Sequence, residues 1–439
     1  MPSLVFVVGT RPEIIKIAPV ILETTKRGIS FLVIHTGQHY DEEMSDQFFE
    51  VLNIKKPEIN LEVQSDDTNI QLGEMIKKLG EKFLELSPDF VIAVGDTISV
   101  LASCLASVQA NIPFVHVESG LRSLDNTMPE EINRKIVDSV SSLLFSPSQR
   151  ATTNLMYEGI DPNRVFFVGN TIVDSIRIFS DVLEKNRSTI AQEILESIEG
   201  DYIICTIHRV SNTEDKEKLE EIVNALNKID DLTIIFLLHP RTKKKLLEFN
   251  LMDQFKKIPN LRINSSIDYL SMLKIMKDDR CRLILTDSGG LQEEAATLKI
   301  PCLTLRPNTE RPETVEQGIN KLVKVDSKEI LQAVHEALTQ ENLQEKFDDF
   351  IFPYGDGYAS EKILDVIKVF WNKAKFKSPE MYETGSRSFT LLKIETEIER
   401  TLIEGNLKGK ITMVYDEKGN PIPIPKRLER GYIVRVTRT

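Results

Sequence analysis

The chain of 439 residues carries 67 acidic and 55 basic side chains, which leaves a formal net charge of −12. This acid excess argues against nucleic acid or an anionic membrane surface as the main partner, although a local basic pocket could still hold a small anionic substrate. No apolar run approaches the ~20 residues that a membrane-spanning helix requires, and the N-terminus lacks the basic flank of a signal peptide, so we expect a cytoplasmic protein without a membrane span.

Short apolar runs rich in β-branched residues recur along the first half of the chain, and amphipathic stretches long enough for a helix separate most of them. This alternation predicts a parallel sheet covered by helices on both faces. The expected strands are Leu4–Val8, Phe31–Ile34, Phe90–Val94, Phe114–Val117 and Val165–Val168.

A second series of the same kind follows, so the fold class we predict is α/β with two doubly wound Rossmann-like domains that face a cleft. Its expected strands are Tyr202–Thr206, Thr233–Leu238, Leu261–Ile263, Arg282–Thr286 and Cys302–Leu305. We place the N-terminal domain at residues 1–175 and the C-terminal domain at residues 176–372. In such sheets ligands bind beyond the carboxyl ends of the strands.

A small C-terminal extension completes the chain. Residues 373–387 lose apolar periodicity and contain Pro379 and Gly385, which is typical of a linker. Leu391, Glu395, Ile398 and Leu402 then outline one helix face, and strands at 410–415 and 431–437 flank a Lys418-Gly419-Asn420-Pro421 turn. The extension, residues 373–439, has no role that the sequence identifies.

The four cysteines are widely separated, and each lies in or beside an apolar segment. This pattern is typical of small core residues in a reducing compartment, and no C-x-x-C pair occurs. We therefore predict neither a disulfide nor a zinc site.

Two strand-to-helix turns carry features of phosphate binding. Arg11 follows the first strand and Gly9, at the start of a helix, where anions are favoured. Ser288, Gly289 and Gly290 open a helix with bare backbone N–H groups, which suits a diphosphate. The alternative explanations are an exposed arginine and an ordinary N-cap serine. No G-x-G-x-x-G fingerprint follows the first strand, which argues against a dinucleotide cofactor.

Three carboxylates follow strands of the first half: Asp96, Glu118 and Glu130. Acids at neighbouring strand ends converge on one crevice, where burial and mutual repulsion separate their pKa values and suit them to acid and base roles. Each has a structural alternative; for Glu130 it is an ion pair with Arg134 one helical turn later.

Histidines provide further candidates. His208 and Arg209 lie where the first strand of the second domain ends and could neutralise the charge of a leaving group. His39 and His239 are weaker candidates, since a lone histidine at a strand end is more often structural. His116 precedes Glu118 by two residues, so it is expected on the same side of that strand.

Together these segments resemble the non-hydrolysing UDP-N-acetylglucosamine 2-epimerase family, over residues 1 to about 370. The matching motifs are Gly9-Thr10-Arg11-Pro12-Glu13, Thr36-Gly37-Gln38-His39, Gly95-Asp96-Thr97, His116-Val117-Glu118-Ser119-Gly120-Leu121-Arg122, Pro129-Glu130-Glu131-Ile132-Asn133-Arg134, His208-Arg209, Thr286-Asp287-Ser288-Gly289-Gly290-Leu291-Gln292-Glu293-Glu294-Ala295 and Thr309-Glu310-Arg311-Pro312-Glu313.

The resemblance implies a glycosyltransferase-B-like pair of domains, with UDP held mainly by the second. It implies reversible interconversion of UDP-GlcNAc and UDP-ManNAc by elimination and re-addition of UDP, without a cofactor or an essential metal, in a homodimer. The roles that it implies are general acid/base catalysis for Asp96, Glu118 and Glu130, leaving-group stabilisation for His208, and substrate binding for Arg11, Ser288, Gly289, Gly290, Glu294 and Arg311. Which carboxylate acts as acid and which as base stays open.

Gln38, His39 and His239 are candidates for a second, regulatory site, but Tyr40-Asp41 follows where family members commonly carry another glutamine, which argues against allosteric activation. Two alternative functions stay open. One is 2-epimerisation of a related UDP-hexosamine such as a 6-deoxy sugar. The other is a UDP-sugar-dependent glycosyltransferase of the same fold.

Overall fold

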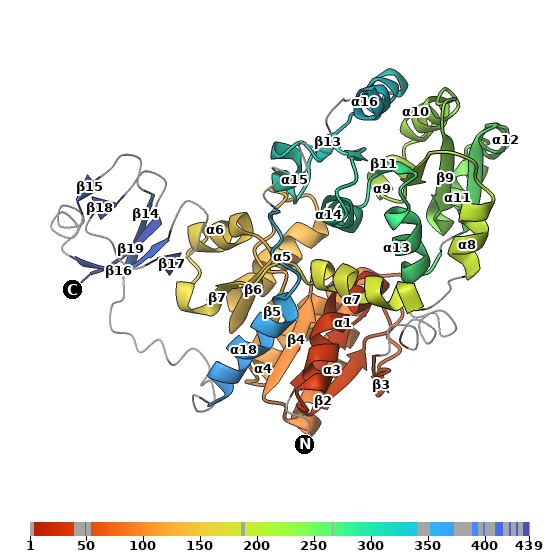
Figure 1. Ribbon diagram of the computed structural model, residues 1–439. Coiled ribbons are helices and arrows are strands. Elements are labelled where there is room, and N and C mark those ends of the chain that lie inside the picture. The colour runs from red at the N-terminus through yellow and green to blue at the C-terminus, as the bar shows by residue number, and fades with distance from the viewer. Residues whose placement is uncertain are drawn as a thin grey trace. The chain divides into compact units, whose positions relative to one another are not determined.

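The computed structural model describes residues 4–38, 49, 54–185, 189–265, 267–339 and 352–372, followed by the strands of the C-terminal tail (Figure 1). Contacts divide the chain into two compact units. The first comprises residues 1–171 and 354–439, and the second comprises residues 172–353. Within the described residues, no helix is long and apolar enough to cross a membrane.

The first unit is built on a seven-stranded parallel sheet with the strand order β3-β2-β1-β4-β5-β6-β7. Its strands are β1 (Leu4–Val8), β2 (Phe31–His35), β3 (Ile59–Asn60), β4 (Phe90–Val94), β5 (Phe114–Val117), β6 (Leu143–Ser146) and β7 (Val165–Phe167). The central strands are apolar throughout because both faces of the sheet are covered.

The helices of this unit alternate with its strands: α1 (Arg11–Lys26), α3 (Thr68–Leu86), α4 (Ile98–Gln109), α5 (Pro129–Val140), α6 (Gln149–Tyr157), a 3-10 helix (Pro162–Arg164) and α18 (Ala359–Asn372). Val5, Val7 and Val91 share a buried cluster with side chains of α3 and α4. Phe90 points to the opposite face of the sheet, where its ring meets Trp371 of α18 edge-on at 6.0 Å. The sheet is therefore covered on both sides.

The second unit has a six-stranded parallel sheet with the order β10-β9-β8-β11-β12-β13. Its strands are β8 (Tyr202–Thr206), β9 (Thr233–Leu238), β10 (Leu261–Ser265), β11 (Cys281–Thr286), β12 (Cys302–Thr304) and β13 (Asn320–Leu322). Its helices are α7 (Thr171–Lys185), whose first residue belongs to the first unit, α8 (Thr189–Glu196), α9 (Val210–Thr213), α10 (Lys216–Leu226), α11 (Pro240–Glu248), α12 (Met252–Lys256), α13 (Tyr269–Lys277), α14 (Gly289–Thr297), α15 (Pro312–Glu316) and α16 (Ser327–Thr339).

Alternate residues of these strands enter two different cores, as the pleat requires. Ile203 and Cys205 belong to the cluster that contains α10 and α16, whereas Tyr202 and Ile204 belong to the cluster that contains α8, α13 and α14.

The predicted α/β class with two doubly wound parallel sheets is confirmed. The predicted domain boundaries at 175 and 372 stay a prediction, although by contacts residues 354–372 group with the first sheet.

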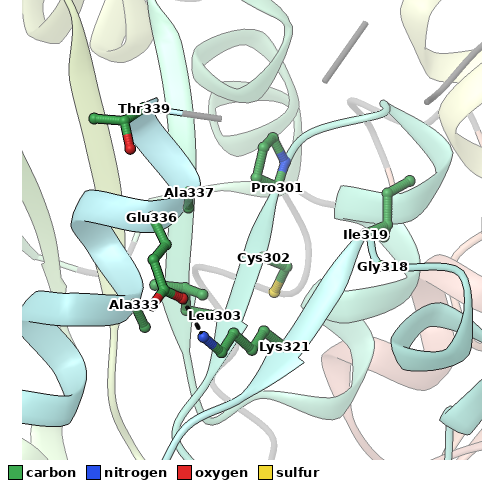
Figure 2. A pocket seen from close by; sticks show the side chains of 10 residues that line it. All are labelled: Pro301, Cys302, Leu303, Gly318, Ile319, Lys321, Ala333, Glu336, Ala337 and Thr339. Carbon is green, nitrogen blue, oxygen red and sulfur yellow. Dashed lines mark hydrogen bonds and ion pairs between the residues drawn. The ribbon is translucent and has the colours of Figure 1, made fainter. Parts of the chain in front are cut away.

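A cavity of about 450 Å³ lies at the amino ends of β12 and β13, against α16 (Figure 2). Pro301, Cys302 and Ala333 line it, and the ion pair between Lys321 Nζ and Glu336 Oε2 (2.5 Å) lies beside it. Ligands of parallel α/β sheets bind at the opposite, carboxyl ends of the strands. This cavity is therefore separate from the predicted site.

The C-terminal tail contains an antiparallel sheet with the order β14-β19-β16-β17 and a two-stranded pair, β15 with β18. Its strands are β14 (Phe389–Lys393), β15 (Ile398–Glu399), β16 (Gly409–Tyr415), β17 (Pro421–Ile422), β18 (Arg427–Leu428) and β19 (Ile433–Arg438). The two predicted strands are present, and the predicted linker lies outside the described residues. The predicted helix face is wrong: Leu391 and Ile398 lie on strands whose hydrogen bonds come from strands much later in the chain.

Candidate active site

The turn between β1 and α1 is organised by a buried glutamate. Glu13 Oε2 accepts hydrogen bonds from the backbone N–H groups of Gly9 (2.6 Å) and Thr10 (3.1 Å), and Glu13 Oε1 accepts one from the Thr97 hydroxyl. Thr97 follows β4, so Glu13 ties two neighbouring strand ends together. Burial raises the pKa of Glu13 to about 7, and nearby Asp96 adds to the rise, while the three hydrogen bonds oppose it.

Glu118 follows β5 and is held by a cation from α1. Lys16 Nζ lies 2.5 Å from Glu118 Oε2, and both side chains are largely buried. Glu118 has a φ of +69°, in the left-handed region that non-glycine residues seldom adopt. Such backbone strain persists only where the surrounding structure enforces it, and it is concentrated at functional sites.

Asp96 follows β4 and is held from α5. Arg134 Nη1 lies 2.5 Å from Asp96 Oδ2, and Asn133 Nδ2 donates to the Asp96 carbonyl oxygen at 2.8 Å. Arg134 is 1% exposed and also contacts buried Glu131 at 2.7 Å, whereas the Asp96 side chain is 30% exposed. The arrangement keeps one carboxylate open to a ligand beside a buried guanidinium.

Glu130 lies in the first turn of α5, one turn before Asn133 and Arg134. Within the described part of the chain it has no hydrogen-bond or ion-pair partner, and its side chain is half-buried. The alternative explanation of Glu130 as an ion-pair partner of Arg134 is wrong, because Arg134 is occupied by Asp96 and Glu131.

Arg11 and Gln38 complete the predicted residues of the first unit that the structure describes. Arg11 is the first residue of α1 and is half-buried, with Thr10 as the N-cap residue. Gln38 Oε1 accepts a hydrogen bond from Ser99 Oγ at 2.7 Å, and Ser99 Oγ also lies 2.7 Å from Thr36 Oγ1. His39 lies outside the described residues.

In the second unit, the turn after β11 leaves the start of α14 uncapped. Ser288 occupies the N-cap position, but its side chain makes no capping hydrogen bond. The first backbone N–H groups of the helix therefore lack a side-chain cap, at the end where the helix dipole favours an anion. A Cβ atom on Gly289 would lie 3.0 Å from Arg311 Nη1, whereas one on Gly290 would point into open space.

His208 follows β8 and is fixed through its backbone by buried Asp287. The N–H of His208 donates to Asp287 Oδ1 (3.0 Å), and the N–H of Arg209 and the side chain of Asn212 donate to Asp287 Oδ2 (3.0 and 3.1 Å). Burial lowers the pKa of the His208 imidazole, and the positive charges of Arg209, Arg241 and Arg306 lower it further, while Asp287 opposes them. His208 is therefore a neutral imidazole near pH 7, within a cationic environment.

Three arginines surround the buried carboxylate of Glu310. Arg306 Nη1 lies 2.9 Å from Glu310 Oε2, and Arg311 Nη1 and Arg209 Nη2 lie 3.0 and 3.6 Å from Glu310 Oε1. Arg311 Nε also contacts Glu293 Oε1 at 2.9 Å. Arg311 also lies beside the uncapped start of α14, so the cluster places guanidinium groups next to helix N–H groups, an arrangement that suits a diphosphate.

His239 and Glu294 have supporting positions in this unit. The His239 ring lies 5.5 Å from the His208 ring, and His239 Nδ1 accepts a hydrogen bond from the Arg241 N–H at 3.2 Å. Arg241 Nη1 in turn donates to the His208 carbonyl oxygen at 2.9 Å. Glu294 lies half-buried on α14, next to Glu293.

The structure thus distributes the predicted residues over two groups, one in each unit. The first contains Arg11, Gln38, Asp96, Glu118 and Glu130, and the second contains His208, His239, Ser288, Gly289, Gly290, Glu294 and Arg311. Sequence reasoning assigned no role to Lys16, Glu131, Asp287 or Glu310. A signal existed for Lys16, which is the one charged residue in the apolar run Ile14-Ile15-Lys16-Ile17-Ala18.

Comparison with known proteins identifies the family of the chain. A family model described as UDP-N-acetylglucosamine 2-epimerase matches residues 22–368. The UDP-N-acetylglucosamine 2-epimerase of Methanocaldococcus jannaschii is 43% identical over 368 residues, which cover 83% of this chain and 98% of the relative. The chain belongs to the UDP-N-acetylglucosamine 2-epimerase family.

One relative is named for a different UDP-sugar, and solved structures share the fold. The UDP-2,3-diacetamido-2,3-dideoxy-D-glucuronate 2-epimerase of Pseudomonas aeruginosa is 34% identical over 368 residues, covering 82% of this chain and 98% of the relative. The crystal structure of the M. jannaschii UDP-GlcNAc 2-epimerase in complex with UDP-GlcNAc and UDP superposes with a TM-score of 0.77 at 43% identity, over 83% of this chain and 99% of that one. The family match ends before the C-terminal tail.

Proposed function

We propose that the chain interconverts UDP-GlcNAc and UDP-ManNAc by inverting C2 of the sugar, without a cofactor. The observation that carries this proposal is the set of carboxylates at the ends of β4 and β5 and at the start of α5. Asp96 and Glu118 each lie beside a cation, whereas Glu130 is unpaired among the described residues. A transferase or a nucleotide-sugar sensor would need the anion site but not these acids.

The C2 proton is not adjacent to a carbonyl group, so the reaction needs the departure of UDP. In the forward direction a carboxylate takes the C2 proton, the C1–O bond breaks with its electron pair on UDP, and a 2-acetamidoglucal forms. UDP then adds back to C1 while a carboxylic acid delivers a proton to the opposite face of C2. The cycle is redox-neutral, and its net change is the configuration at C2.

The roles proposed for individual residues are those that the family resemblance implies. Asp96, Glu118 and Glu130 move the protons, a task in which positioned acids and bases typically contribute ~10²- to 10⁴-fold each. The neutral His208 donates a hydrogen bond to the leaving diphosphate oxygen. The remaining residues bind the substrate: the Ser288, Gly289 and Gly290 amides, Arg11 and Arg311 hold the diphosphate, and Glu294 holds the ribose.

The test is incubation of the purified full-length chain with UDP-GlcNAc alone in D₂O, followed by NMR of C2. The expected result is deuterium at C2 together with UDP-ManNAc. Free sugar with stoichiometric UDP would indicate a hydrolase, and no change without an added acceptor would indicate a transferase. Glu118→Gln and His208→Ala variants should lose turnover, while Glu158→Gln, on the surface of the same unit as Glu118, is the matched control.

A second candidate is 2-epimerisation of a related UDP-hexosamine, including a 6-deoxy sugar. The name of the P. aeruginosa relative specifies a different UDP-linked acetamido sugar, a glucuronate. This supports the second candidate, because the same UDP-binding residues can serve several sugars. Comparison of kcat/KM for UDP-GlcNAc and for its 6-deoxy analogue decides between the two. A higher value for the analogue would replace the first proposal.

We also propose a homodimer in the cytoplasm. Ile132, Ile136 and Val140 lie four residues apart along α5, and each is between 38% and 47% exposed. An apolar stripe of this kind is typical of a protein–protein contact. Light scattering after size-exclusion chromatography should give about twice the monomer mass of 50.0 kDa, and Ile136→Glu should give the monomer.

Gln38, His39 and His239 stay candidates for a regulatory site, which a sigmoidal dependence of rate on UDP-GlcNAc would support.

A further inference from the structure

A buried histidine–aspartate pair lies behind two of the proposed catalytic acids. His116 Nδ1 lies 2.6 Å from Asp138 Oδ1, and the Gly120 N–H donates to Asp138 Oδ2 at 3.0 Å. His116 and Asp138 are both 0% exposed. The pair cannot touch a substrate, so any part that it has in the reaction acts through other residues.

The pair is connected to Glu118 from both sides along the chain. His116 lies two residues before Glu118, Gly120 lies two residues after it, and both are hydrogen-bonded to the single carboxylate of Asp138. Between these anchors Glu118 adopts its φ of +69°. A left-handed conformation is unfavourable for a non-glycine residue, and an anchor on each side holds this strained turn in place.

The same ring also reaches the neighbouring strand end. His116 Nε2 lies 2.8 Å from the carbonyl oxygen of Gly95, the residue directly before Asp96. Both ring nitrogens therefore face acceptors, one on Asp138 and one on the backbone after β4. A single imidazole thus connects the backbone next to Asp96 with the backbone next to Glu118.

Asp138 is held as an anion by its other partners. Arg122 Nη2 lies 2.8 Å from Asp138 Oδ2, and Arg122 also pairs with Glu158 at 2.6 Å. Burial alone would raise the pKa of Asp138, but His116 and Arg122 outweigh burial and hold it below its usual range. The carboxylate therefore keeps both acceptor oxygens available to His116 and Gly120 at neutral pH.

We infer that the His116–Asp138 pair is a positioning device that sets the mutual placement of the Asp96 and Glu118 carboxylates. This inference rests on the proposed function. Proton transfer at one carbon requires both carboxylates to be placed within a fraction of an ångström, and a misplacement of 1 Å can cost about 100-fold in rate.

The first test is Asp138→Asn, which keeps the shape but replaces one acceptor oxygen with an NH₂ group. We expect kcat to fall about 100-fold while the dissociation constant of UDP stays within about twofold, because most of the proposed diphosphate residues, Ser288 to Gly290 and Arg311, lie in the other unit. Glu158→Gln removes the outer partner of Arg122 and leaves His116 and Gly120 bonded to Asp138. It is the matched control and should keep kcat within about threefold of wild type.

Two His116 variants separate the contacts and serve if Asp138→Asn does not fold. The amide nitrogen of His116→Asn replaces Nδ1 and keeps the bond to Asp138, while that of His116→Gln replaces Nε2 and keeps the bond to Gly95. We expect each to lose kcat without a matching change in the KM for UDP-GlcNAc. A merely structural role would lower the melting temperature but leave kcat of the folded protein unchanged.

The inference is overturned if the folded variants keep kcat within about threefold of wild type, or if Glu158→Gln loses as much as Asp138→Asn. Failure of the proposed function gives a different result, since wild type itself would then incorporate no deuterium at C2 of UDP-GlcNAc. The two failures are therefore distinguishable in one set of measurements.

Discussion

Replacement of Glu13 by glutamine changes the pH dependence of stability in a direction that the structure specifies. The side-chain oxygen of glutamine can accept the two backbone hydrogen bonds, from Gly9 and Thr10, that Glu13 Oε2 accepts. The NH₂ group of glutamine can donate a hydrogen bond to the Thr97 hydroxyl. The variant therefore keeps the hydrogen-bonding geometry of the protonated acid. What it removes is the ability of a 3% exposed side chain to ionise.

The sign follows from proton binding. The pKa of Glu13 is raised from 4.5 to about 7, so between these values the folded chain holds a proton that the unfolded chain has released. The free energy of unfolding of wild type therefore falls as pH rises through this window, and a rise of this size corresponds to about 3 kcal/mol. Glu13→Gln does not lose stability in this way. The free energy of unfolding of the variant minus that of wild type should therefore rise by about 3 kcal/mol between pH 4.5 and pH 8.

Tryptophan fluorescence provides the assay, because the only tryptophan of the chain, Trp371, packs against Phe90 of the first unit. Urea unfolding of wild type and Glu13→Gln at several pH values gives the difference between their free energies of unfolding at each pH. Glu23→Gln is the matched control: burial opposes ionisation of Glu23, but Arg27 and Lys26 outweigh it and lower its pKa, so this variant should lose stability near neutral pH. A constant difference between Glu13→Gln and wild type across the window would refute the reasoning, since the hydrogen bonds would then outweigh burial.

Three further substitutions, one of them a control, test the halves of the site. Gly289→Ala places a Cβ atom 3.0 Å from Arg311 Nη1 and should lower the free energy of unfolding by about 1–2 kcal/mol. The Cβ atom of Gly290→Ala meets nothing within 4 Å, so this control should keep the free energy of unfolding or raise it by up to about 1 kcal/mol. Equal effects of the two variants in urea titrations would contradict the packing argument. Lys16→Met removes the cation beside Glu118 and should lower kcat about 100-fold or more in the C2 exchange assay. A Lys16→Met variant with wild-type turnover would show that this ion pair is only structural.

The strands were predictable because sheets covered on both faces require continuous apolar runs. Leu4–Val8, Phe90–Val94 and Thr233–Leu238 have the same bounds in sequence and in structure. Leu143–Ser146 and Asn320–Leu322 were not predicted; the second is three residues long and contains a lysine, which leaves little apolar pattern. The helix expected in the tail was wrong because β14 and β15 are stabilised by distant partners, β19 and β18, which a local helical spacing does not reveal.

The candidate site was predictable where a motif follows a strand, as for Asp96, Glu118 and His208. The partners that hold these residues were not, because the contact of Lys16 with Glu118 spans 102 residues and that of Arg134 with Asp96 spans 38. The pattern suggested Glu130 as the partner of Arg134 because i,i+4 pairs are the ones that a sequence displays. In the structure Arg134 pairs instead with Asp96, which follows β4, and with Glu131 of its own helix.

The return of α18 to the first sheet has a consequence for biosynthesis. Arg27 of α1 bonds Asp365 and the Glu361 carbonyl oxygen of α18, so the outer layer of the first sheet is supplied by residues made after the whole second unit. A ribosome translating this message at about 5–20 residues per second would expose that sheet for roughly ten seconds or more before its cover emerges. Nascent chains should therefore depend on chaperones more than the finished protein does, and truncations before residue 372 should aggregate.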